Sequence, residues 1–163
     1  MIKWIKTRKG FFQMKTRYDI PCNIAQSLNI IGDRWSLLIV HEILNGQTLF
    51  NEMKKALPGI SSNLLSDRLK YLEEEGLISA ELYSVHPPRY RYQLTKSGEE
   101  LEHVFNALIL WGTSHLQKCY KKLIDSETGD EVEIAYQNKK NGDIVKHVEV
   151  VAVQEQLQKA GDQ

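Results

Sequence analysis

The sequence predicts an α+β fold that is mainly helical. Three observations carry this prediction: apolar residues recur at helical spacing through the first half of the chain, alternating residues follow at 77–94, and a long helical pattern comes next. A length of 163 residues suits one domain with an appendage, and 42% hydrophobic with 26% charged residues is a globular composition. The predicted order is helix, helix, helix, helix, hairpin, long helix, extra hairpin.

Four helices are predicted before the hairpin, over residues 23–32, 35–44, 50–57 and 61–75. Their apolar residues are mostly three or four positions apart, and the second helix is apolar nearly all round, as expected of a helix buried in a small core. The fourth has the clearest ends, because serines precede it and a glycine follows it. Its predicted core face consists of Leu65, Leu69 and Leu72.

The segment 77–94 predicts two antiparallel strands joined by a loop at HPPR. Pro87 and Pro88 are expected to interrupt regular structure there and to stiffen the loop. The alternation in RYRYQLT then defines two faces. The core-facing set is Tyr90, Tyr92 and Leu94, and the outward set is Arg89, Arg91 and Gln93.

A long helix is predicted from Ser97, which has capping-box spacing with Glu100, to about Ile124. Its apolar stripe is wider than one neighbour can cover. After Ser126, the stretches EVEIAYQ and IVKHVEVVAV flank the turn NKKNGD and predict a valine-rich hairpin with a polar tail. No internal repeat is expected. The predicted parts are a basic leader over 1–19, a main domain over 20–124 and an extension over 125–163.

The charges are unevenly distributed, although the net charge is zero. Residues 1–18 carry six basic side chains and no acid, whereas residues 125–163 carry nine acids and four bases. The acidic end can therefore mask a cationic surface elsewhere. Two cysteines are too few for a disulfide scaffold, and no apolar run is long enough to span a membrane, so we expect a cytoplasmic protein without a membrane partner.

Helices followed by a two-stranded hairpin are typical of the winged helix-turn-helix, here with a long C-terminal helix and an extra C-terminal β-hairpin. Residues 50–57 would support a recognition helix at 61–75. Asparagine can pair with adenine, serine can contact a base edge or a phosphate, and the helix N-terminus attracts phosphate. The alternative is that this polar face only contacts solvent. Asp67 would repel a phosphate, so it would instead hold the neighbouring Arg68 in place or accept a hydrogen bond from a cytosine amine. The candidate recognition residues are Ser61, Ser62, Asn63, Ser66, Asp67, Arg68 and Lys70.

The hairpin supplies the candidate wing contacts, His86, Arg89 and Arg91. Two guanidiniums on a stiff turn can hold phosphates or enter a narrow minor groove, and the histidine adds a weaker, pH-sensitive contact. The alternative is that both arginines balance Glu81 across the hairpin, worth about 0.2–1 kcal/mol per cross-strand pair. We favour contact of these arginines with DNA, because the hairpin follows a helix with the features of a DNA-recognition helix.

Four stretches and a later LW carry a family resemblance: NIAQSLNIIGDRWSLLIVHEIL, FNEM, LPGISSNLLSDRLKYLEEEGLI and PPRYRYQLTKSGEEL. Over about residues 20–117 they resemble the HxlR family of bacterial transcriptional regulators, relatives of MarR. The resemblance implies a homodimer that binds pseudo-palindromic operator DNA through its winged helices. Leu49 departs from the family, which usually has arginine there. The first and last helices would form the dimer interface, with Ile24, Leu28, Leu101, Phe105, Leu108 and Trp111 as its candidates.

Cys22 occupies a position near the first helix where the family often has a cysteine that in some relatives senses oxidants or electrophiles. A helix N-terminus favours the thiolate, but a buried free cysteine is also common as a small hydrophobe. Cys119 is expected to pack. No catalytic motif, metal site or cofactor is expected, and the partners are double-stranded operator DNA, a second copy, and a small-molecule or oxidant effector. Repression is favoured over activation, and the alternatives are a winged-helix protein-interaction module and a thiol redox protein.

Overall fold

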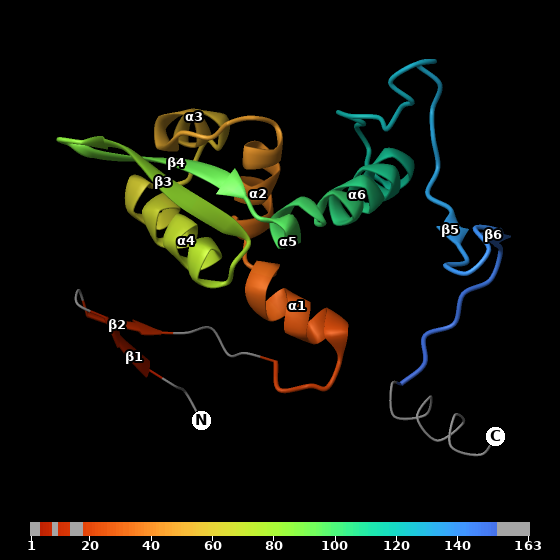
Figure 1. Cartoon of the computed structure of the whole chain (residues 1–163), viewed down its shortest axis with the longest axis horizontal. Coiled ribbons are helices and arrows are strands. Elements are labelled where there is room, and N and C mark those ends of the chain that lie inside the picture. The colour runs from red at the N-terminus through yellow and green to blue at the C-terminus, as the bar shows by residue number, and fades with distance from the viewer. Residues whose placement is uncertain (1–3, 8–9, 14–17, 153–163) are drawn as a thin grey trace. The chain divides into compact units, whose positions relative to one another are not determined.

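The computed structural model describes residues 4–7, 10–13 and 18–152. The chain forms two units, Met1–Phe105 and Asn106–Gln163, which are described separately. The helix α6 (Glu102–His115) begins in the first unit and ends in the second. The other main elements of the first unit are α1 (Asn23–Ile31), α2 (Ser36–Leu44), α3 (Phe50–Ala56), α4 (Ser62–Glu74), β3 (Ile78–Val85), β4 (Pro88–Leu94) and α5 (Lys96–Glu99), as Figure 1 shows.

The core of the first unit lies where α2, α3 and α4 meet the antiparallel pair β3–β4. The four helices predicted from apolar spacing are all present, with ends within two residues of expectation. The leucines predicted to face the core are buried, each at most 1% exposed. The turn between α3 and α4 contains Gly59 at φ 94°, a conformation that favours glycine over any residue with a Cβ. The winged helix-turn-helix prediction is confirmed.

The strand β4 begins at Pro88, which corrects the expectation that both prolines interrupt regular structure. Proline is tolerated as the first residue of a strand, where its missing N–H breaks no ladder bond. Pro88 pairs with Val85, and the hydroxyl of Ser84 donates to the carbonyl of Pro87 (3.0 Å). Two residues therefore connect the strands.

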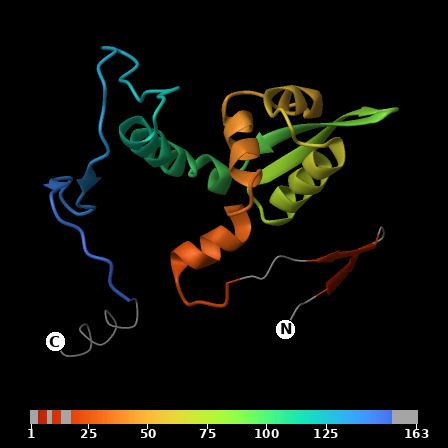
Figure 2. The same cartoon turned by 180° about the vertical axis from the view of Figure 1, so that it is seen from behind.

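The far end of the hairpin extends past the helices in both views (Figures 1 and 2). Tyr92 and Leu94 pack against the core as predicted, but Tyr90 is 44% exposed. The alternation assigned Tyr90 to the correct strand face, but its partner Leu82 is itself 46% exposed, so this part of the hairpin lies beyond the core of the described residues. The period of a strand sets which face a residue occupies, and only the packing against that face decides whether the residue is buried.

A different residue from the predicted Ser97 caps the helix after β4. Thr95 accepts a hydrogen bond from the amide of Gly98 (3.3 Å) and donates its hydroxyl to the carbonyl of Gly76 (2.6 Å). This second, tertiary bond cannot be read from local spacing. Gly98 lies so close to Leu77 that a Cβ would stand 2.1 Å from its carbonyl oxygen, which explains a glycine inside a helical turn.

The long helix ends at His115, nine residues before the predicted end near Ile124. Gly112 and Thr113, which are weak helix formers, stand at this end. The chain then folds back, and the Thr113 hydroxyl lies 3.3 Å from the carbonyl oxygen of Lys121. Cys119 is exposed in this bend, so the expectation that it packs is wrong.

The extension contains β5 (Tyr136–Gln137) and β6 (Ile144–Val145), which pair antiparallel around the predicted turn at 138–143. The predicted hairpin is present but much shorter than its valine content suggested. An earlier turn at 125–130 has the same backbone hydrogen bonds as the turn at 138–143. In each turn, the carbonyl of the first residue accepts from the glycine amide (2.9 Å in the earlier turn and 2.8 Å in the later one). The amide of the first residue donates to the carbonyl of the last residue (2.8 and 2.9 Å). DSETGD and NKKNGD therefore form turns of the same type.

The leader contains a short antiparallel pair, β1 (Trp4–Thr7) and β2 (Gly10–Gln13). Most of the basic residues of this leader lie outside the described part of the chain, as do residues 153–163 of the polar tail. From Tyr18 onward the chain is tied to α1, because the Asn29 side chain bonds both the amide (2.7 Å) and the carbonyl (3.0 Å) of Tyr18.

Candidate nucleic-acid interface

The outer face of α4 presents most of the polar side chains predicted to read DNA. The exposed members are Ser61, Ser62, Asn63, Ser66, Asp67 and Lys70. Ser61 is the N-cap of α4 and accepts a hydrogen bond from the amide of Leu64 (3.2 Å), so its hydroxyl is already engaged in the fold. The other five keep their side chains toward solvent, and the helix therefore offers hydrogen-bonding groups over its first turns.

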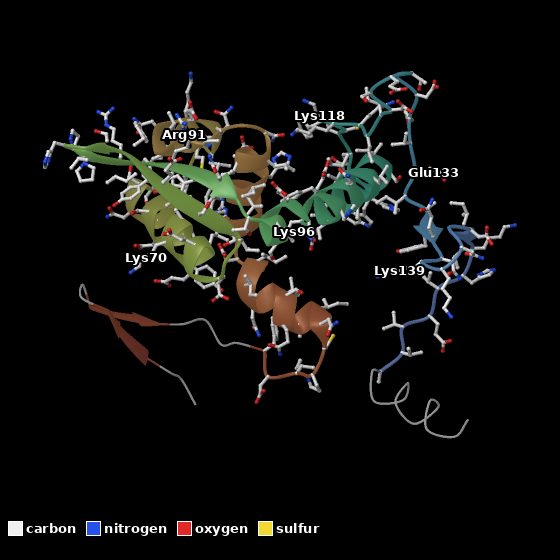
Figure 3. All side chains as sticks on the ribbon, in the orientation of Figure 1. Lys70, Arg91, Lys96, Lys118, Glu133 and Lys139 are labelled. Atoms are coloured by element: carbon white, nitrogen blue, oxygen red, sulfur yellow. The ribbon has the colours of Figure 1, made fainter. Side chains whose placement is uncertain are left out.

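Lys70 projects from α4 (Figure 3) and lies 3.6 Å from Glu74, one turn further along the helix. Both side chains are more than 60% exposed, so solvent screens the pair and its contribution is small. A phosphate can therefore compete with Glu74 for the ammonium group at little cost.

Arg68 is turned inward, unlike the other basic residue predicted on this helix. Its Nη1 lies 3.4 Å from Oδ2 of Asp33, and the two side chains are only 17% and 19% exposed. The guanidinium carbon also lies 5.6 Å from the centre of the Tyr71 ring. Arg68 thus fixes α4 to the segment before α2. The carboxylate that holds Arg68 is that of Asp33, and not that of Asp67 as suggested from the sequence.

Asp33 joins the start of α2 to α4. Its Oδ1 accepts hydrogen bonds from the backbone amides of Trp35 (2.9 Å) and Ser36 (3.2 Å). The Ser36 hydroxyl, which is fully buried, donates to Oδ2. Burial alone would raise the pKa of Asp33, but the hydrogen bonds from Ser36 and Trp35 and the charge of Arg68 outweigh it and lower the pKa. The carboxylate therefore stays ionised and holds the start of α2 against α4.

A second tie joins α4 to the end of α1, where the Tyr71 hydroxyl donates to the carbonyl of Asn29 (3.0 Å). Together with Arg68, it sets the angle at which α4 is presented. Sequence reasoning missed Asp33, Tyr71 and Asn29 as positioning residues. The Asp in GDRW just before a helix was a readable capping signal, but its partner on α4 lies 35 positions away along the chain.

The wing residues His86, Arg89 and Arg91 are all exposed at or near the end of the hairpin. Arg91, labelled in Figure 3, lies opposite Glu81, and its guanidinium carbon is 5.9 Å from the centre of the Tyr83 ring. Within residues 18–152, neither Arg89 nor Arg91 forms an ion pair. The alternative in which Glu81 neutralises both arginines therefore has no support in the geometry.

The residues predicted to form a dimer interface fall into two groups. Ile24 and Leu28 on α1 are 72% and 43% exposed, and Leu108 and Trp111 on α6 are 52% and 59% exposed. The remaining two contribute to the core of their own chain. Phe105 lies in the core and is only 6% exposed, and Leu101 packs against the core. Helical periodicity could not separate the two groups, because α6 has apolar residues on more than one side.

Cys22 is exposed and stands at the N-cap of α1, as predicted from its place in the sequence. Its side chain makes no capping hydrogen bond. The alternative of a small hydrophobe buried within its own chain therefore does not hold. Across the described ranges, no group of three or more His, Cys, Asp or Glu side chains is arranged to hold a metal ion, and no helix there is long and apolar enough to cross a membrane.

Known proteins share this arrangement. Residues 30–120 match the family described as HxlR-like helix-turn-helix. The chain is 30% identical over 106 residues to YtcD of Bacillus subtilis (strain 168), named an uncharacterized HTH-type transcriptional regulator, covering 65% of this chain and 82% of YtcD.

Two solved structures are also similar. The structure of PA1607, described as a candidate transcription factor, has a TM-score of 0.68 and 27% identity, over 83% of this chain and 96% of that one. The redox regulator HypR in its oxidized form has a TM-score of 0.54 and 30% identity, over 60% of this chain and 100% of HypR. With the family match over residues 30–120 and the winged helix-turn-helix geometry, these likenesses lead to one conclusion: the chain belongs to the HxlR-like helix-turn-helix family of transcriptional regulators.

Proposed function

We propose that this chain is a homodimeric repressor that binds a pseudo-palindromic operator and blocks access to a promoter. One observation carries the proposal: α4 exposes Ser62, Asn63, Ser66 and Lys70 on the side away from its buried leucines, while the adjoining hairpin exposes Arg89 and Arg91. Polar side chains on a helix suit base edges in the major groove, and arginines on a hairpin suit phosphates.

A titration of the purified protein against labelled fragments of its own chromosome tests this proposal. We expect tight, salt-sensitive binding to a small set of fragments that contain an inverted repeat, and lower transcription from the promoters they carry. A folded protein that shows no salt-sensitive affinity for any duplex would instead favour the alternative of a winged helix used for protein contact.

Replacing Asn63 by alanine is expected to change which operator sequence is preferred. The amide side chain can pair bidentately with adenine, and such a pair is worth about 1–3 kcal/mol of discrimination between bases. Selection of bound sequences from a random pool would show relaxed preference at one position in each half-site. Glu73→Ala, an exposed change near the other end of α4, is the control. An unchanged preferred sequence with uniformly weaker binding would contradict the assignment.

The proposed dimer is supported by two exposed apolar faces, one on α1 with Ile24 and Leu28 and one on the second half of α6 with Leu108 and Trp111. Contiguous apolar patches are seldom left in water on a monomer, and two-fold symmetry is the usual way to cover them. Sedimentation equilibrium should give twice the 18.8 kDa of one chain. A single-chain mass at micromolar concentration would exclude the dimer.

We also propose that oxidants or electrophiles regulate the protein through Cys22. The thiol is exposed at the start of α1, and the similar protein HypR is described as a redox regulator. Treatment with a mild oxidant is expected to change the operator affinity of the wild type and leave Cys22→Ser unchanged. Cys119→Ser is the matched control, because Cys119 is exposed as well. An equal response of the wild type and Cys22→Ser would remove Cys22 from the mechanism.

A further inference from the structure

Tyr83 occupies an irregular position in β3. The register pairs Leu82 with Tyr90 and Ser84 with Arg89, which leaves Tyr83 as an extra residue between two paired ones. A bulge of this kind re-aims a side chain and strengthens the local twist. The guanidinium carbon of Arg91 stands 5.9 Å from the centre of the Tyr83 ring, so the ring lies on the same face of the hairpin as this arginine.

The backbone of Arg91 is held from both sides. Glu81 on β3 lies opposite it, and Leu49 forms an isolated bridge with it on the other side. The next residue, Tyr92, donates its amide to the carbonyl of Thr48 (2.8 Å). Most of the remaining freedom of Arg91 is therefore in its long side chain, whose ordering opposes binding.

Two neighbours compete for the Arg91 guanidinium. Glu81 is its direct cross-strand partner, yet no ion pair joins them in the described structure, and the Tyr83 ring has the contact instead. A carboxylate would occupy the N–H groups that a phosphate needs. An aromatic face attracts the cation through its π electrons and leaves the N–H groups at the edge of the guanidinium free to donate.

We infer that Tyr83 is a positioning residue that orders Arg91 for a contact with a DNA phosphate, whereas Arg89 reaches the DNA as a mobile side chain. Arg89 makes no aromatic or ionic contact within residues 18–152. The two arginines of the wing thus contribute differently: Arg91 binds with little ordering left to do, and Arg89 must be ordered on binding. The inference rests on the proposed DNA-binding function and goes beyond it by naming the residue that prepares the contact.

The test measures affinity for a short labelled duplex of mixed sequence at several salt concentrations, since a phosphate contact needs no operator. Tyr83→Leu is expected to weaken binding about two- to five-fold, the range for an exposed cation–π contact. Tyr83→Phe keeps the aromatic face and should bind as the wild type does. Thermal unfolding of each variant verifies that the hairpin remains folded.

The decisive comparison is a double-mutant cycle, because a purely structural role of Tyr83 would be independent of Arg91. In the Arg91→Ala background, Tyr83→Leu should have no further effect on affinity or on the salt slope. In the Arg89→Ala background it should keep its full effect. Glu81→Gln should leave affinity unchanged or raise it, since a negative charge near the phosphate is removed.

Three results would overturn the inference, and they differ from one another. An equal loss from Tyr83→Leu with and without Arg91 would give Tyr83 a structural role and leave DNA binding intact. A loss from Glu81→Gln that matches that of Tyr83→Leu would make the carboxylate the positioning group. A wild-type protein that does not bind duplex DNA even in dilute salt would contradict the proposed function, and the role of Tyr83 would then be excluded as well.

Discussion

Replacing Arg89 and Arg91 together by alanine is expected to weaken binding to every DNA sequence alike. If each arginine neutralises one phosphate, each wing loses two contacts, and counterion release then predicts a loss of roughly sixty-fold at 0.1 M salt for every wing that docks. The slope of log affinity against log salt concentration should fall by about 1.8 per wing. Fluorescence anisotropy over a range of salt concentrations measures both quantities.

The control changes the net charge equally at a distant part of the sequence. Lys139→Ala with Lys140→Ala removes two exposed positive charges from the turn at 138–143, which lies in the second unit. Similar losses from both double variants would mean that general attraction, not the wing, drives the affinity. A wing variant that keeps its salt slope would likewise contradict phosphate contacts by these arginines.

Replacing Asp33 by alanine is expected to lower the free energy of unfolding by about 2–3 kcal/mol, because hydrogen bonds to a charged group are removed and partners are left buried. Ser36, Trp35 and Arg68 would each lose the hydrogen bond that Asp33 accepts. Urea unfolding at neutral pH measures the change. Asp67→Ala, an exposed carboxylate on the outer face of α4, is the control and should change stability by at most about 0.5 kcal/mol.

The same carboxylate predicts a pH dependence with a defined sign. Because the pKa of Asp33 is lower in the folded than in the unfolded chain, its ionised form stabilises the fold above the ordinary aspartate pKa. That contribution is lost as the pH falls through the lowered folded pKa. The stability difference between the wild type and Asp33→Asn should therefore shrink on acidification below pH of about 4. A difference that stays constant down to strong acid would show that Asp33 is not the titrating group.

Local patterns in the sequence were sufficient for the winged helix-turn-helix core. The spacing of Leu65, Leu69 and Leu72 predicted the buried side of α4, and so also the polar side that we propose binds DNA. The order of helices and hairpin, together with the motif combination from residue 20 to 117, identified the family that the match over residues 30–120 confirms.

Errors arose where a local signal competed with a contact distant in sequence. Thr95, not Ser97, caps α5 because its hydroxyl also reaches Gly76. The apolar pattern after Gly112 suggested more helix, but the chain folds back toward Thr113. The turn at 138–143 was predicted from NKKNGD, but the turn at 125–130, which makes the same hydrogen bonds, was not, because its residue types differ.

The sequence by itself determined which elements form from α1 to β4 and which of their faces are polar, because hydrophobic periodicity and turn residues act within a few positions of each other. Only the tertiary structure decided what each charged side chain does. Arg68 and Lys70 are close neighbours on α4, yet Arg68 is fixed to Asp33 while Lys70 stays at the surface. Arg91 rests on Tyr83, which is two residues from its cross-strand partner Glu81 and so shares its face of the hairpin. Which charged groups interact depends on the distances between them in space, and the folded chain sets these distances.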